Sequence, residues 1–105
     1  MKMIRAIVRP EKEYEVVRSL ENAGFSSVTK MDVLGRGKQK GIQVGSAVYD
    51  ELAKTLLMVV LEDSLCDKAV AAITESAKTG NFGDGKIFIS TVESALTIRT
   101  GKTGL

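Results

Sequence analysis

A glycine-rich segment toward the C-terminus carries the residues best suited to bind an anion. Residues 80–86 read Gly-Asn-Phe-Gly-Asp-Gly-Lys, which matches the first seven positions of the phosphate-binding pattern G-x-x-x-x-G-K. The match is incomplete, because Ile87 stands where a hydroxyl would hold magnesium, and because the segment is predicted to follow a helix and open a strand. Glycine amides and the Lys86 ammonium can still hold a phosphate. The alternative is an ordinary glycine turn between a helix and a strand, in which Lys86 forms a salt bridge.

Two further segments combine glycine with positive charge. Residues 35–50 contain four glycines, the three cations Arg36, Lys38 and Lys40, and no acidic residue before Asp50. Near the C-terminus, Arg99 and Lys102 flank a glycine. Considered one at a time, these segments can be interpreted as a solvated loop and a charged tail. A long loop inside a compact domain, however, is usually functional or mobile. All three segments together would suit a triphosphate.

The composition excludes several kinds of active site. The chain has no histidine and a single cysteine, Cys66, so a Ser–His–Asp triad, a Cys–His pair, an ordinary zinc site and an intrachain disulfide cannot form. Cys66 falls on an apolar helix stripe, where a buried, inert thiol is expected. The net charge of +2 and the 5% of aromatic residues do not favour nucleic-acid binding. No apolar run reaches the roughly 20 residues of a membrane span and no secretory signal is evident, so we expect a cytoplasmic location.

Hydrophobic spacing predicts the elements that position these segments within one domain of 105 residues. Strands are expected at residues 3–9, 28–34, 55–61 and 86–92, with a short fifth at 95–99, and amphipathic helices at 11–23 and about 65–79. Gly24 is expected to close the first helix, and Asp63 with Ser64 to cap the second. We expect a loop over residues 35–50 and fraying over residues 100–105.

The resulting order is strand–helix–strand, long loop, strand–helix–strand, which predicts an α+β protein with a ferredoxin-like split βαβ sandwich (βαββαβ). Both helices are expected on one face of a four-stranded antiparallel sheet. The strand at 55–61 is apolar on both of its faces, so the uncovered face of the sheet should be apolar as well. An apolar patch of that size predicts association. We therefore expect a homo-oligomer built face to face around its sheets.

Four segments of the chain form a specific combination. They are Ile4–Pro10 (I-R-A-I-V-R-P), Gly35–Gly41 (G-R-G-K-Q-K-G), Thr79–Phe88 (T-G-N-F-G-D-G-K-I-F) and Ile98–Gly101 (I-R-T-G). They occur in this order across nearly the whole chain, and together they resemble the P-II family of nitrogen-signalling proteins. The resemblance implies a single regulatory domain over residues 1–105, with a long loop at about 37–53, a nucleotide-binding loop at 79–86 and a C-terminal loop at 94–105.

The resemblance implies a ferredoxin-like homotrimer that binds ATP or ADP in clefts between subunits and senses 2-oxoglutarate with Mg-ATP. The residues that it implies for the nucleotide are Ile7, Thr29, Gly35, Gly37, Lys38, Gln39, Lys40, Val60, Gly83, Asp84, Gly85, Lys86 and, from a neighbouring subunit, Arg99. Those that it implies for 2-oxoglutarate are Gly37, Gln39, Lys40, Gly41 and Lys54, with Gln39 also touching the magnesium. An ammonium such as that of Lys54 suits a carboxylate in a sheltered cleft.

The chain departs from the family pattern at several positions. Lys38 replaces an arginine, which keeps the charge but loses the bidentate fork, and Thr97 replaces a second C-terminal arginine. The long loop is shorter than in the common bacterial form, and Ala47 stands where many members have a modified tyrosine. The shortened loop, the Thr97-Ile98-Arg99 ending and the segment Gly80–Gly83 resemble the branch of the family that regulates nitrogenase in methanogenic archaea and some anaerobic bacteria, and in particular the first of its two sister proteins.

That branch implies a regulator, not an enzyme, which works with a sister P-II protein and binds the dinitrogenase component of nitrogenase. The shared motifs also fit a P-II protein that controls an ammonium channel or glutamine synthetase. Two alternatives lie outside the family. A small acylphosphatase-type or nucleotide hydrolase is disfavoured by the lack of histidine and of paired carboxylates. An RNA-binding sheet needs exposed aromatic residues, and Phe88 alone falls in a predicted strand.

Overall fold

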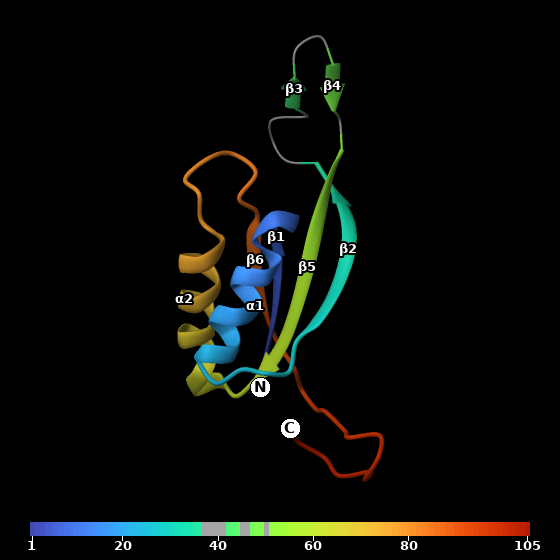
Figure 1. Cartoon of the computed structure of the whole chain (residues 1–105). Coiled ribbons are helices and arrows are strands. Elements are labelled where there is room, and N and C mark those ends of the chain that lie inside the picture. Colours follow the sequence, from blue (N-terminus) through green and yellow to red (C-terminus); the bar gives the residue numbers. More distant parts are fainter. Residues whose placement is uncertain (37–41, 45–46, 50) are drawn as a thin grey trace.

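The computed structural model describes residues 1–36, 42–44, 47–49 and 51–105. Four strands form one antiparallel sheet in the order β2-β5-β1-β6, with β1 at Lys2–Val8, β2 at Thr29–Gly35, β5 at Leu52–Leu61 and β6 at Lys86–Thr91. The helices α1 (Glu13–Asn22) and α2 (Cys66–Ala77) lie side by side on one face of the sheet (Figure 1). A short 3-10 turn precedes each helix, at Pro10–Lys12 and Asp63–Leu65. The predicted ferredoxin-like arrangement is confirmed.

The core lies between the sheet and the two helices. Every second residue of the two central strands is buried there, as the alternation predicted: Ile4, Ala6 and Val8 from β1, and Thr55, Leu57, Val59 and Leu61 from β5. The helices contribute Val16, Leu20, Cys66, Ala69, Ala72, Ile73 and Ala77. The predicted central position of β5 is confirmed, because it pairs with both β1 and β2.

The first helix ends at a glycine, as predicted. Gly24 has a φ of +98°, a left-handed conformation that glycine adopts without strain. Its N–H donates to the Glu21 carbonyl at 3.0 Å, and the Phe25 N–H donates to the Leu20 carbonyl at 2.8 Å. These two bonds satisfy carbonyls that the helix end leaves open, and they turn the chain back toward β2.

The boundaries of α2 differ from the prediction. No side chain at its N-terminal end makes a capping hydrogen bond, so the expected caps at Asp63 and Ser64 are wrong. The Asp63 carboxylate pairs instead with the Met1 amine at 3.0 Å, and this hydrogen-bonded ion pair lowers the pKa of Asp63. The amine is within reach because β1 begins opposite the end of β5. At its other end α2 stops at Ala77, since Lys78 is already extended.

Two segments that were predicted to lack regular structure are folded. Within residues 35–50, β3 (Ile42–Val44) pairs antiparallel with β4 (Ala47–Tyr49), which places a second aromatic residue in a strand. The expected strand at 95–99 does not form. That segment turns back on residues 100–105, where the Thr97 N–H donates to the Lys102 carbonyl and the Gly104 N–H to the Ala95 carbonyl, both at 2.9 Å. Local turn bonds therefore replace both the strand and the expected fraying.

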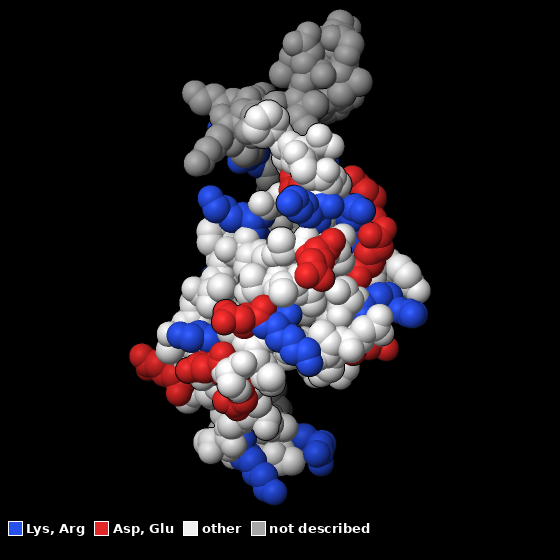
Figure 2. Space-filling view, turned by 90° about the vertical axis from the view of Figure 1, so that its left-hand side faces the viewer, with Lys and Arg blue, Asp and Glu red and all other residues white. Residues whose placement is uncertain are grey.

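The surface carries charges of both signs. Figure 2 looks from the side of α2, where acidic and basic side chains are interspersed over the body. Below the body projects the tail, residues 94–105, which has basic side chains and no acidic one (Figure 2). No helix in the described part of the chain is long and apolar enough to span a membrane.

The sheet face opposite the helices is open and largely apolar, as expected, although the exposed side chain of Arg5 also lies on it. The central strands place Ile7, Leu56 and Met58 on it, because these alternate with the buried residues. Met31 on β2 and Phe88 on β6 face the same way and are 46% and 51% exposed. Such a face favours association in water. The homotrimer itself stays a prediction, because one chain does not test it.

We predict that Leu56→Lys dissociates the assembly and leaves the chain folded. The new ammonium would lie on the open face between Ile7 and Met31, where a neighbouring subunit would have to bury it. Size-exclusion chromatography with light scattering should show a trimer for the wild type and a monomer for this variant.

Leu57→Ala is the matched control, because the next side chain along β5 faces the core and is fully buried. It should preserve the trimer and lower the free energy of unfolding by about 2–5 kcal/mol. A wild type that is monomeric at micromolar concentration would contradict the expected assembly.

Candidate functional site

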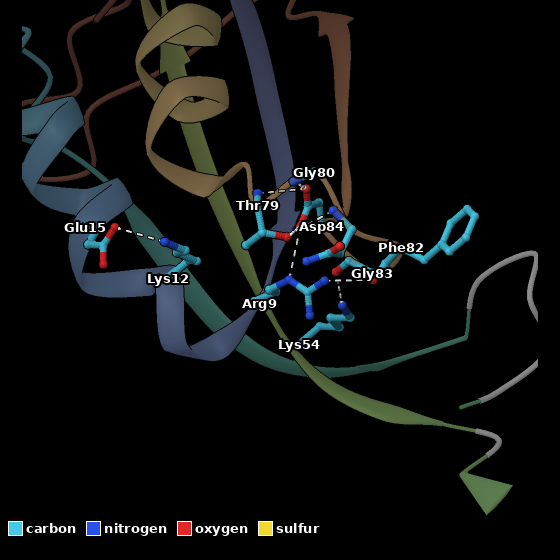
Figure 3. Close-up of polar contacts among 10 residues, drawn as sticks. Arg9, Lys12, Glu15, Lys54, Thr79, Gly80, Phe82, Gly83 and Asp84 are labelled. Carbon is cyan, nitrogen blue, oxygen red and sulfur yellow. Dashed lines mark hydrogen bonds and ion pairs between the residues drawn. The ribbon is translucent and has the colours of Figure 1, made fainter. Parts of the chain in front are cut away.

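The loop between α2 and β6 is folded around the carboxylate of Asp84. One carboxylate oxygen accepts the backbone N–H groups of Thr79 at 2.9 Å and Gly80 at 2.8 Å. The other oxygen accepts the Thr79 hydroxyl, whose oxygen in turn accepts the Asn81 N–H at 3.2 Å. Figure 3 shows these bonds converging on Asp84. The carboxylate therefore determines the shape of the loop from inside it.

Arg9, at the end of β1, ties this loop to the sheet. Its Nε donates to Asp84 Oδ1 at 3.1 Å and its Nη2 donates to the Phe82 carbonyl at 2.7 Å (Figure 3). The bonds from Thr79, from the Gly80 amide and from Arg9 hold the pKa of Asp84 well below its usual range. Asp84 is consequently ionised at neutral pH and paired with a cation.

Lys54 reaches the same loop from β5. Its ammonium donates to the Gly83 carbonyl, and its stem passes beside Gly35, where an added Cβ would lie 3.2 Å from Lys54 Cγ. Burial and the nearby charge of Arg9 lower the pKa of Lys54. No carboxylate in the described part of the chain lies within ion-pair distance of this ammonium. Lys54 thus offers a positive charge that a ligand carboxylate could pair with.

Gly85 fixes the end of the loop against β1. A Cβ on Gly85 would lie 1.7 Å from the Ile7 carbonyl oxygen, so only glycine fits at this distance, and its φ is +105°. Lys86 follows directly, begins β6 and pairs in register with Ile7. The loop therefore follows a helix and opens a strand, which confirms that it is not a P-loop of the usual kind.

A cavity of about 340 Å³ adjoins the loop between the C-terminal end of α2 and the start of β6. Its lining is Ile7, Val8, Ile73, Thr74, Ala77, Lys78, Asp84, Gly85, Lys86 and Ile87. Four of the residues expected to bind nucleotide, Ile7, Asp84, Gly85 and Lys86, contribute to it.

The expected site residues divide between the two ends of the sheet. Gly35, Lys54 and residues 83–86 gather at the end where β1 finishes. Val60 pairs with Met3, four residues back along β1 from Ile7, which is about 13 Å at 3.3 Å per residue. Thr29 lies midway between these two ends, since it pairs with Met58, which in turn pairs with Arg5 in the middle of β1. Figure 1 shows the tail that carries Arg99 leaving from the end of the sheet where Val60 lies.

The remaining expected residues cannot be placed. Gly37, Lys38, Gln39, Lys40 and Gly41 lie outside the described residues. This group includes the expected magnesium ligand, Gln39. Over the ranges that the structure does describe, no cluster of three or more His, Cys, Asp or Glu side chains could hold a metal ion.

Sequence reasoning missed the residues that shape the loop. Arg9 and Thr79 fall within the family-matching segments Ile4–Pro10 and Thr79–Phe88, but the sequence assigned no binding or positioning role to either residue. A signal for Thr79 was present, because a Thr-Gly pair followed by an aspartate is typical of side-chain bonds to nearby backbone amides. No local signal marked Arg9, which lies 75 residues from Asp84.

Comparisons with known proteins match the whole chain to one family. The family model for nitrogen regulatory protein P-II matches residues 1–102. Nitrogen fixation nifHD1 region GlnB-like protein 1 of Methanosarcina barkeri is 57% identical, and nitrogen fixation nifHD region GlnB-like protein 1 of Methanobacterium ivanovii is 58% identical, each over 105 residues and 100% of both chains. Nitrogen regulatory protein P-II of Bradyrhizobium diazoefficiens is 40% identical over 109 aligned residues, which cover 100% of this chain and 97% of that protein.

We predict that two glycines of the loop respond differently to alanine. Gly80→Ala adds a Cβ with nothing within 4 Å, so only the positive φ of +88° is penalised, by about 1–2 kcal/mol in the free energy of unfolding. Gly85→Ala adds the overlap with the Ile7 carbonyl and should cost about 3–4 kcal/mol. Urea unfolding measures both. If both variants lost the same free energy of unfolding, the close approach of Gly85 to β1 would not contribute to stability.

We also predict a pH-dependent stability difference between the wild type and Asp84→Asn. Because folding lowers the pKa of Asp84, its contribution to stability is complete above the ordinary value of 3.8 and is lost progressively as the pH falls below that value toward the lowered pKa of the folded state. The wild type should therefore be the more stable protein from pH 7 to pH 5, with a gap that narrows below about pH 4. The free energies of unfolding of both proteins should be measured in urea from pH 7 down to below about pH 4. Glu75→Gln, an exposed change on α2, is the control and should show no such gap.

Proposed function

This chain belongs to the P-II family of nitrogen regulatory proteins, and from that premise we propose that it senses nitrogen status by binding ATP or ADP together with 2-oxoglutarate. Its immediate role would be regulation of a target protein in the cytoplasm, not catalysis. The observation that supports the ligand class is that Lys54 and Lys86 lie beside a glycine loop whose one carboxylate is already paired with Arg9. Excess positive charge beside such a loop suits a polyanion.

The nucleotide would bind between two copies of the chain in a homotrimer. The division of the expected residues between two ends of the sheet supports this, because no single chain brings Ile7 and Val60 to one pocket. One copy would supply residues 83–86, Ile7 and Gly35 with the adjoining segment Gly37–Lys40. Its neighbour would supply Thr29, Val60 and the tail with Arg99. Asp84 would contribute through the shape of the loop, since both of its oxygens already accept hydrogen bonds.

We assign the 2-oxoglutarate site to Lys54 and the segment Gly37–Gly41. The support is an ammonium that is partly buried and lacks a carboxylate partner among the described residues. A charge-assisted bond to a carboxylate is stronger than the bond that this ammonium makes to the Gly83 carbonyl. The amide oxygen of Gln39 is a ligand type that Mg²⁺ accepts, and the metal would supply charge neutralisation between ATP and 2-oxoglutarate.

The proposed target is the dinitrogenase component of nitrogenase, bound together with a sister P-II protein. The support is that two relatives of equal length and 57–58% identity carry nitrogen fixation in their names. Residues 37–53 would form the docking segment, and β3 with β4 gives this segment a two-stranded core. The alternative is another target of nitrogen assimilation, such as an ammonium channel or glutamine synthetase.

We predict coupled ligand binding that depends on Lys54. Calorimetry should detect ATP binding by the wild type with magnesium, and 2-oxoglutarate binding only when Mg-ATP is present. Lys54→Gln should weaken 2-oxoglutarate binding at least about tenfold, the loss expected for one charge-assisted hydrogen bond, and leave ATP binding nearly unchanged. Lys68→Gln, an exposed change on α2, should alter neither. Binding of 2-oxoglutarate without ATP, or brisk and saturable phosphate release, would contradict the proposal.

We predict that the target is recognised through the segment between β2 and β5. Shortening the chain between Ile42 and Tyr49 should abolish inhibition of nitrogenase and preserve ATP binding. A pull-down from nitrogen-fixing cell extract should recover the dinitrogenase component with the wild type and not with the shortened chain. Recovery of an ammonium channel or glutamine synthetase instead would favour the alternative target. Loss of ATP binding in the shortened chain would show that the two roles are not separate.

A further inference from the structure

Arg9 contacts three consecutive residues of the loop between α2 and β6. Its Nη2 donates to the Phe82 carbonyl at 2.7 Å and its Nε to Asp84 Oδ1 at 3.1 Å. Between these two residues, an added Cβ on Gly83 would lie 3.3 Å from Nη2, so the guanidinium packs closely against the backbone there. Figure 3 shows the guanidinium inside the curve of the loop. One side chain therefore fastens the part of the loop that precedes Gly85.

The groups that Arg9 holds are the ones that would oppose a bound phosphate. The Asp84 carboxylate is negative, and the Phe82 carbonyl presents the negative end of its dipole. Arg9 neutralises the first and takes up the second. The backbone N–H groups of Phe82 and Gly83 point to no acceptor among the described residues, so they remain available to an anion.

We propose that Arg9 is a positioning residue for phosphate binding, which acts through Asp84 and Phe82 and does not itself touch the nucleotide. This inference rests on the proposed function, because it assumes that residues 83–86 hold the phosphates of ATP. The two donors of Arg9 that point to the loop are already used within it. The side chain is 21% exposed, which further limits its reach to an added ligand.

The position favours arginine over lysine for a physical reason. The guanidinium is a planar fork with several N–H donors, so it can serve a carboxylate and a carbonyl in two directions at once. A lysine ammonium is a point charge on a flexible stem. The backbone at Arg9 is extended, with φ −62° and ψ 137°, as expected for a residue that precedes proline. Pro10 thereby helps to aim the side chain at the loop.

The test is a double-mutant cycle on ATP binding, measured by calorimetry with the full chain. Arg9→Gln leaves Asp84 unneutralised beside the phosphates, and we expect ATP affinity to fall about 10- to 100-fold. In the double variant Arg9→Gln with Asp84→Asn, the two amides form a neutral pair that can keep the contact. We expect it to recover most of the lost affinity.

A direct contact between Arg9 and the nucleotide gives a different result. The double variant would then bind ATP as weakly as Arg9→Gln alone, and the inference would be overturned. Lys12→Gln is the matched control, because Lys12 lies three residues further on and its one ion pair among the described residues is with exposed Glu15 at 3.3 Å. It should leave ATP affinity unchanged. An equal loss in Lys12→Gln would point to general electrostatics and would also overturn the inference.

Stability distinguishes positioning from a merely structural role. Urea unfolding should show that Arg9→Gln changes the equilibrium constant of unfolding by a much smaller factor than it changes the dissociation constant for ATP. If Arg9→Gln does not fold, Arg9→Lys replaces it, and its affinity should fall while its charge is kept. A wild type that binds neither ATP nor inorganic triphosphate would overturn the proposed function and this inference with it. A wild type that binds ATP no better than Arg9→Gln would overturn this inference alone.

Discussion

The ionised carboxylate of Asp84 holds together the loop between α2 and β6, where the candidate site lies. Asp84 accepts hydrogen bonds from Thr79, Gly80 and Arg9, and these bonds give residues 79–84 their shape. In the proposed role of this loop, an unpaired carboxylate here would repel phosphates, and the ion pair with the Arg9 guanidinium would remove that repulsion. The loop is thereby attached to β1, and its backbone amides take positions set by the sheet.

The sheet to which this loop is attached has two different faces. Alternation along β1 and β5 sends one set of side chains into the core and the other to the open face. The open face also carries several of the expected ligand residues, with Lys54 toward one end, Thr29 in the middle and Val60 toward the other end. Under the proposed function, association through the open face would also complete the nucleotide site, because a second chain would bring the two ends together.

The failed predictions share a physical cause. Asp63 had the residue type and place of a helix cap, but the Met1 amine competes for its carboxylate once β1 and β5 are paired. Residues 95–99 had the alternation of a strand, but glycine turns beyond them offer local hydrogen bonds, and the sheet has no strand there to pair with. In both cases a contact between distant or following residues outweighed a local preference.

The two helices, the four strands of the main sheet, the buried faces of the central strands and the family could all be predicted from the sequence, because hydrophobic period and short motifs are local properties. The sequence also identified the glycine loop and Lys54 as candidates for anion binding. The contacts that each candidate makes became visible only in the folded chain. Folding turned Asp84 inward, brought Arg9 to it across 75 residues, and left Lys54 without a described carboxylate partner. Those pairings depend on the register of β1 against β5 and β6, which local spacing does not encode.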